Sequence, residues 1–321
     1  MLSSSLFPGD GDIGYWSDHS NSLEKLAENK DILFRGTDSV TCAADEDWRL
    51  KSRLSLYGSW QTYEKEAALP GFSTRSFGLT TGLLRHGKKN LFLGFGAGGD
   101  WFSADEKTGV LQKDVNAFKL FGHGGIDRDQ WSWDIHAGYG YHDQKLMHSF
   151  NASQWNGKRT AEQYGISTEF RIKVSSGLFQ MEPFLGFDYL NLEESPYQAK
   201  PVFGTLSPMN VSSSNHTVKG GTLGLRYRWR QTSLFATWYP ELSGSWSHEF
   251  GGGDLFRTSW NDPFPCVYTV SGYESGRDRL IFGASLTGKF GRSMDIFIRY
   301  NASMTNRENM HTVFTGMSWY F

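Results

Sequence analysis

The chain has 321 residues, a formal net charge of −2 and a pI near 6.5, so it lacks the basic surface that nucleic-acid-binding proteins carry. Its mean hydropathy is −0.48, and no apolar run is long enough for a transmembrane helix. The 24 Phe, 14 Tyr and 12 Trp, with 37 Gly beside them, fit a β-barrel whose strands are apolar on one face only.

An N-terminal segment, residues 1–47, is predicted to contain a helix over about 22–35. Asn21 can cap it, with Glu24 at the third position and Gly36 at the far end. Its apolar positions include Leu23, Leu26, Leu33 and Phe34. Such a helix would be about 21 Å long, most of a bilayer core. We expect it in the lumen of a barrel; an amphipathic helix outside the barrel and a disordered leader are the alternatives.

Twelve strand-like segments follow within residues 48–321. They cover 49–63, 72–85, 91–103, 115–126, 131–145, 160–174, 178–192, 218–229, 233–250, 278–290, 294–304 and 311–321. Short connections follow the even-numbered segments and longer ones follow most of the odd-numbered segments. Even strand number and alternating short and long connections are typical of bacterial outer-membrane barrels. The sequence therefore predicts an all-β, 12-stranded antiparallel transmembrane barrel, and this alternation disfavours a soluble sandwich.

The alternation within single segments predicts which face meets lipid. In TLGLRYRWR, the side chains of Leu223, Leu225 and Tyr227 share one face, and those of Arg226 and Arg228 share the other. An arginine on the lipid face near mid-membrane costs roughly 2–4 kcal/mol. The charged face is therefore expected to line the lumen, which in a twelve-strand barrel of roughly 12 Å backbone radius admits about one helix.

The last eleven residues, HTVFTGMSWYF, alternate up to the final residue. A closed barrel requires the last strand to pair with the first, because lipid cannot satisfy an open strand edge. Trp319 and Phe321 are then expected in the aromatic girdle at the periplasmic interface. The pattern also resembles the signal that the barrel-assembly machinery recognises, in which Thr315 is weaker than the usual apolar residue. The residues of this predicted signal are Val313, Thr315, Met317, Trp319 and Phe321.

Several stretches together resemble the autotransporter β-domain, the translocator of type V secretion. They are SFGLTTGLLRHGKKNLFLGFGAGGDWF, DIHAGYGYH, EPFLGFDYLNLEE, GGTLGLRYRW and VSGYESGRDRLIFGASLTGKF followed by SMDIFIRYNAS. The resemblance implies an integral protein of the bacterial outer membrane that exports its own passenger segment, with the passenger side extracellular. It also makes residues 22–35 the linker helix. The lumenal charges that would line its path are Glu169, Arg171, Glu182, Arg226, Arg228 and Arg299.

The chain departs from the family pattern because fewer than fifty residues precede the barrel and no signal peptide is visible. We therefore expect either that this is the C-terminal part of a longer protein or that its start has been misassigned. A small-solute channel is the alternative function, and a barrel hydrolase is a weaker one. Asp134 and His136 share a face but lie at the periplasmic end, while His148 and Ser149 point oppositely. We expect no enzyme activity, no metal and no cofactor. The expected partners are outer-membrane lipid, the assembly machinery and the passenger, around a monomeric barrel.

Overall fold

The computed structural model describes residues 49–63, 71–87, 90–106, 111–150, 153–203, 207–251, 277–291, 293–306 and 308–321. The predicted helix at 22–35, with Leu23, Leu26, Leu33 and Phe34, lies outside the described residues. In the described ranges no helix is both long and apolar enough to cross a membrane.

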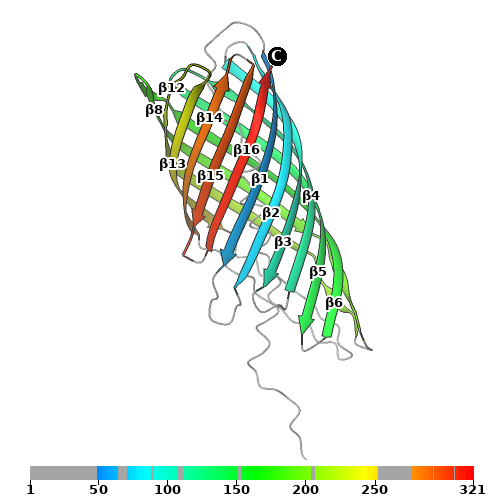
Figure 1. The fold of residues 1–321 in the computed structure, drawn as a ribbon. Coiled ribbons are helices and arrows are strands. Elements are labelled where there is room, and N and C mark those ends of the chain that lie inside the picture. The colour runs from blue at the N-terminus through cyan, green and yellow to red at the C-terminus, as the bar shows by residue number, and fades with distance from the viewer. Residues whose placement is uncertain are drawn as a thin grey trace, which may run out of the picture.

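Twelve long strands form the wall of the molecule (Figure 1). They are β1 (Arg49–Tyr63), β2 (Phe72–His86), β3 (Leu91–Glu106), β4 (Leu111–Asp127), β5 (Trp131–Phe150), β6 (Ser153–Ile172), β8 (Phe179–Glu194), β11 (Ser214–Trp229), β13 (Thr237–Gly251), β14 (Asp278–Phe290), β15 (Met294–Met304) and β16 (Glu308–Tyr320). Four short strands extend them: β7 (Val174–Ser176), β9 (Tyr197–Pro201), β10 (Met209–Val211) and β12 (Gln231–Thr232).

The sheet closes on itself through its first and last strands. Each long strand pairs antiparallel with the next, and β16 pairs with β1 from Lys51↔Tyr320 to Tyr63↔Glu308. Beyond the strand end, Phe321 N–H donates to the Leu50 carbonyl at 2.9 Å, and Leu50 N–H donates to the Phe321 carbonyl at 3.3 Å. The predicted twelve-stranded antiparallel barrel is confirmed, and the terminal residue is held in its ladder.

The two faces of the wall differ as the sequence alternation predicts. Leu223, Leu225 and Tyr227 of β11 are exposed on the outer surface, at 58%, 43% and 39%, whereas Arg226 and Arg228 between them point into the lumen. The same alternation recurs along β5, β6, β14 and β15. An apolar outer face of this kind is what a lipid environment requires, and closure through β16 and β1 pairs the edges of the wall.

The end of the barrel that carries the chain terminus Phe321 has tight turns (Figure 1). Gly177 joins β7 to β8 and Gly291 joins β14 to β15, both at a φ of 61°, where a side chain would be strained. Asn90, also at φ 61°, precedes β3. These left-handed positions let neighbouring strands reverse within a few residues.

The opposite end is taller than the sequence predicts, because residues 146–159 were expected as a long loop and instead extend the β5–β6 ladder from Leu146↔Gly157 to Phe150↔Ser153. The β9–β10 hairpin adds to β6 at Trp155↔Pro201, within another segment expected to be a loop. Its buried side chains pack with those of β5: Leu146, Tyr197, Ala199, Met209 and Val211. Strand residues that extend beyond the bilayer do not need an apolar outward face. The sequence there therefore lacks the alternation of apolar and polar residues by which the other strands were predicted.

Candidate functional site

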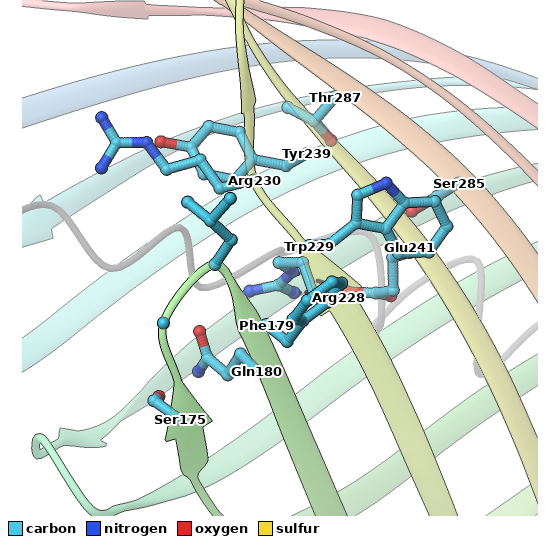
Figure 2. Close-up of a pocket in the computed structure, with 12 residues that line it drawn as sticks. Ser175, Phe179, Gln180, Arg228, Trp229, Arg230, Tyr239, Glu241, Ser285 and Thr287 are labelled. Atoms are coloured by element: carbon cyan, nitrogen blue, oxygen red, sulfur yellow. Dashed lines mark hydrogen bonds and ion pairs between the residues drawn. The ribbon is translucent and has the colours of Figure 1, made fainter.

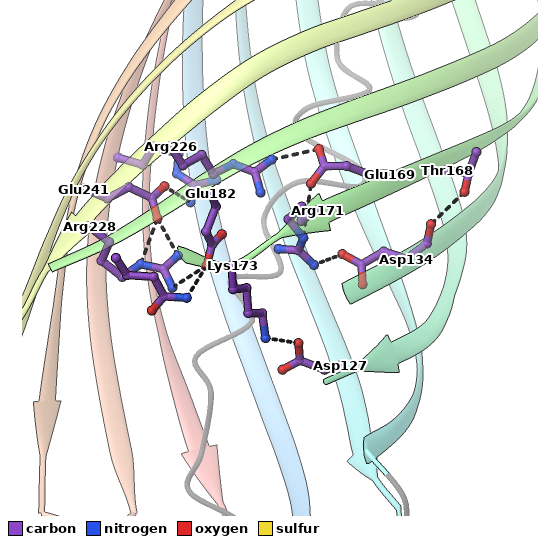
Figure 3. Close-up of polar contacts among 12 residues, drawn as sticks. Asp127, Asp134, Thr168, Glu169, Arg171, Lys173, Glu182, Arg226, Arg228 and Glu241 are labelled. Atoms are coloured by element: carbon purple, nitrogen blue, oxygen red, sulfur yellow. Dashed lines mark hydrogen bonds and ion pairs between the residues drawn. The ribbon is translucent and has the colours of Figure 1, made fainter. Parts of the chain in front are cut away.

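The six predicted lumenal charges come from four strands and are brought close together. Figure 3 shows five of them, Glu169, Arg171, Glu182, Arg226 and Arg228. Strand pairing sets Glu182 directly opposite Arg226, and Arg228 directly opposite Glu241. Because side chains alternate between faces, this register points all of them into the lumen. The resulting lumenal network consists of Asp134, Glu169, Arg171, Glu182, Arg226, Arg228, Glu241 and Arg299.

Glu169 joins the first half of the network. Its Oε2 accepts a hydrogen bond from Arg226 Nη2 at 2.8 Å, and its Oε1 lies 3.5 Å from Arg171 Nε. Arg171 also pairs with Asp134 on β5, and Arg226 lies over the Phe184 ring at 4.4 Å. Two cations therefore share one carboxylate, and each retains a second contact.

Glu241 joins the second half. Its Oε2 accepts a hydrogen bond from Arg228 Nε at 3.0 Å, and its Oε1 lies 3.8 Å from Arg299 Nη2. Arg299 reaches across β14 because Ser285, which pairs with both Glu241 and Arg299 in the ladder, has a short side chain. Arg228 Nη1 also lies 3.9 Å from Glu182 Oε1.

The lumenal network is electrically balanced. Four carboxylates, from Asp134, Glu169, Glu182 and Glu241, face four guanidinium groups, so the formal sum is zero. A cavity of about 60 Å³ lies beside the network, lined also by Ser243, Ser245 and Asn301. A surface of this kind offers many hydrogen-bond donors and acceptors without a strong net field. It suits contact with a polar polymer better than selection of one ion.

Sequence reasoning missed Asp134 and Glu241 as members of this network, although it placed Asp134 on the inward face. It also missed a second set of lumenal charges on β3, β4, β6 and β8. There Lys119 pairs with Asp100, and Arg159 Nη2 lies 2.5 Å from Glu194 Oε1. The alternation of side chains along each strand could have identified them. A charged residue an even number of positions from a lumenal residue of the same strand also faces the lumen.

A larger cavity of about 210 Å³ opens at the end with the tight turns (Figure 2). Arg228 at the end of β11, Arg230 just after that strand and Tyr239 of β13 line this cavity. Glu241 also lines it and pairs with Arg228 in the lumenal network. Its polar lining continues that of the network toward this opening. Charged and polar side chains therefore extend along this side of the lumen from the lumenal network to this mouth.

The residues considered for catalysis are engaged in other contacts. Asp134 pairs with Arg171, and the His136 ring stacks on that of His123 with centroids 5.6 Å apart. His148 Nε2 lies 3.0 Å from the hydroxyl oxygen of Tyr197. Across the part of the chain that the structure describes, no group of three or more His, Cys, Asp or Glu side chains is placed to hold a metal.

The five residues of the predicted assembly signal lie on the outward face of β16 or directly after it. The Thr315 hydroxyl donates to the carbonyl of Phe297 at 3.2 Å, and the Phe321 side chain is 76% exposed. Val313, Met317 and Trp319 are half-buried. The five therefore form a single strip on the outer side of the closing strand.

The sequence matches one family model and no curated protein. Residues 53–301 match the model described as the autotransporter beta-domain. This span covers nine of the twelve long strands completely and most of β1 and β15, and it ends before β16. Among curated proteins, no match to the chain was found.

Solved structures with the same architecture include translocators and a channel. The translocator domain of the autotransporter NalP from Neisseria meningitidis superposes with a TM-score of 0.72 at 16% identity, covering 94% of this chain and 96% of that one. The β domain of the Bordetella autotransporter BrkA superposes with a TM-score of 0.60 at 14% sequence identity, covering 84% of this chain and 98% of that one. The Pseudomonas putida toluene transporter TodX superposes with a TM-score of 0.51 at 7% sequence identity, covering 86% of this chain and 90% of that one. At these identities the likeness is one of fold.

Proposed function

This chain belongs to the autotransporter β-domain family, and from that premise we propose that its barrel exports a passenger polypeptide attached ahead of β1. The protein is an outer-membrane translocator, and the family implies a passenger segment joined to the barrel. The passenger side is extracellular, which makes the tall end formed by β5, β6, β9 and β10 the outer one. The end with the tight turns then faces the periplasm.

The lumen is the proposed path of the exported chain. The observation that carries this proposal is the balanced lumenal network, whose four acids and four arginines offer hydrogen bonds to an extended or helical polypeptide of any sequence. An excess of one charge would hold back passenger segments of the opposite sign. In this proposal residues 22–35 form the linker helix, with Leu23, Leu26, Leu33 and Phe34 on one side. The barrel acts as a transporter and not as an enzyme.

The outer surface and the closing strand serve membrane insertion. The apolar outer face contacts outer-membrane lipid around the whole barrel, which supports a monomer. The barrel-assembly machinery reads the strip formed by Val313, Thr315, Met317, Trp319 and Phe321. Exposure of the Phe321 side chain beyond the strand end supports this role, because a recognition residue must be accessible.

Single-channel conductance of the refolded chain in a planar bilayer tests the proposed path. Wild type is expected to conduct weakly, and a variant without residues 1–47 is expected to conduct strongly, because the linker helix occupies the lumen. Equal and large conductance in both would favour a small-solute channel of the kind that TodX exemplifies in fold. A matched variant with Leu26→Asp and Leu33→Asp keeps the segment length and tests whether its apolar face holds it in place.

A further inference from the structure

Two rows of polar side chains cross the outer surface of β5, β6, β8 and β11 at the tall end of the barrel. The strand register aligns Tyr139, Tyr164, Asn191 and Thr217 in the first row. It aligns Tyr141, Glu162, Glu193 and Asn215 in the second. On β5 the outward-facing apolar and aromatic side chains run from Trp131 to Tyr141, about the 9–11 residues that cross a bilayer core, and the two rows supply the last two of them, Tyr139 and Tyr141. The two rows therefore lie at the headgroup level of the outer leaflet.

A chain of hydrogen bonds fixes the first row against Glu193. The Thr217 hydroxyl donates to Asn191 Oδ1 at 2.7 Å, and Asn191 Nδ2 donates to the Tyr164 hydroxyl at 2.7 Å. Both Tyr164, at 2.5 Å, and Asn191, at 3.2 Å, donate to the same oxygen of Glu193, Oε1. Among the described residues the other oxygen of Glu193 is left to accept further hydrogen bonds. The carboxylate is thus oriented before any ligand arrives.

The second row contains a like-charge pair. Glu162 and Glu193 are direct partners in the β6–β8 ladder, on the same outward face, and both are exposed. Tyr141 is the direct partner of Glu162 in the β5–β6 ladder, and the Tyr164 hydroxyl donates a hydrogen bond to Glu193. Like charges directly opposite each other destabilise a sheet. The arrangement becomes favourable when a molecule that donates hydrogen bonds lies across both carboxylates.

Tyrosine rings surround this carboxylate pair. Tyr139, Tyr141 and Tyr164 expose 40%, 41% and 41% of their surface. An exposed ring offers a flat apolar face with a polar tip, which is why tyrosine is common at membrane interfaces. Carboxylate acceptors beside flat aromatic rings match a sugar, whose hydroxyls donate hydrogen bonds and whose ring has apolar C–H faces.

We propose that Glu162, Glu193 and these three tyrosines bind the sugar headgroup of a glycolipid. The site adjoins the apolar outer band of the barrel, so the acyl chains of a glycolipid can contact that band while its sugar contacts the site. A free sugar would contact only the site. Two carboxylates repel phosphate, so the sugar hydroxyls are the recognised group. The inference rests on the proposed function, which makes this end extracellular and so places it in the leaflet where outer membranes carry glycolipid.

Native mass spectrometry of the full chain released from vesicles measures lipid retention directly. The probes are monoglucosyldiacylglycerol, which has a sugar and no phosphate, and phosphatidylglycerol, which has a phosphate and no sugar. We expect the glucolipid to be retained about tenfold more strongly, since each lost hydrogen bond to a charged group lowers affinity by about that factor. Equal retention of the two lipids would overturn the proposal.

The variants Glu162→Gln and Glu193→Gln separate binding from a structural role. Each is expected to weaken glucolipid retention about tenfold while leaving the ligand-free barrel equally or more resistant to urea, because the substitution removes like-charge repulsion. The matched control is Asp278→Asn, an exposed carboxylate three strands further around at the same end, which should not alter retention. Weaker urea resistance with unchanged retention would assign the two glutamates a structural role only. A chain that does not insert into any vesicle would count against the barrel's proposed function, whereas insertion without sugar preference would count against this site alone.

Discussion

The two walls of the lumen carry similar ionic groups in different settings. On β3 and β4, Lys119 and Asp100 form a pair whose side chains are 0% and 2% exposed. On β6 and β11, Arg226 and Glu169 form a pair that retains 14% and 12% exposure and connects to further charges on both sides. The first pair has few alternatives if one partner is lost, whereas the second can redistribute its contacts. Burial and connectivity, rather than the presence of an ion pair, decide how much each charge matters.

Lys119→Met is expected to have the largest effect, because it leaves the Asp100 carboxylate buried without its cation. Breaking a buried pair by removing one partner lowers the free energy of unfolding by about 3–5 kcal/mol. Urea unfolding of the refolded barrel in vesicles, followed by tryptophan fluorescence, measures the loss. The double variant Lys119→Met with Asp100→Leu should recover most of it. A loss under about 1 kcal/mol, typical of an exposed pair, would remove the contrast between the walls.

Arg226→Met is expected to cost less, about 1–2 kcal/mol, because Glu169 keeps Arg171 and Glu182 keeps Arg228. The same substitution leaves the lumenal network with four acids and three arginines, so ion selectivity should shift toward cations. Urea unfolding and the reversal potential of the variant that lacks residues 1–47 give the two readouts. The matched variant Arg226→Lys should retain selectivity. A stability loss as large as that of Lys119→Met would mean that the remaining charges of the lumenal network do not compensate for the loss of Arg226.

Phe321→Ala lies outside both walls and is expected to leave the stability of the refolded barrel within about 0.5 kcal/mol, since the side chain is largely exposed. Its proposed role in recognition predicts a loss of folded protein in the outer membrane of cells. Quantifying the heat-modifiable barrel in membrane fractions measures this loss. Phe203→Ala, a similarly exposed phenylalanine away from the closing strand, is the control. Equal membrane yields for the two variants would contradict the assembly role.

The smallest effect is expected at an exposed pair on the outer rim. The Asp278 carboxylate accepts hydrogen bonds from His248 Nδ1 at 2.9 Å and from Trp246 Nε1 at 3.0 Å, which lower the pKa of Asp278. A lowered folded-state pKa adds stability above the unfolded value, about 3.9, that is lost as pH falls through the folded value. The stability difference between wild type and Asp278→Asn should therefore shrink below about pH 4. A difference independent of pH would disprove this linkage.

The sequence predicted those parts of the fold in which a lipid environment requires apolar and polar residues to alternate along the strand. Twelve strands, their antiparallel order and the outward faces of segments such as 218–229 follow from strict alternation inside the bilayer. The extension of β5 to Phe150 and the β9–β10 hairpin were missed because water accepts either face of a strand beyond the membrane. The partnership of Glu241 with Arg299 depends on the short side chain of Ser285 between them, a property of register across three strands. Alternation in one segment does not contain that information.

Surface exposure of a reporter fused ahead of residue 1 tests the central claim most directly. In cells that secrete the fusion through the inner membrane, added protease should cleave the reporter from outside while the barrel remains folded in the outer membrane. A matched fusion that lacks β16 should keep the reporter protected, because the barrel cannot close. A folded, membrane-inserted barrel whose reporter stays protected in intact cells would contradict the export function.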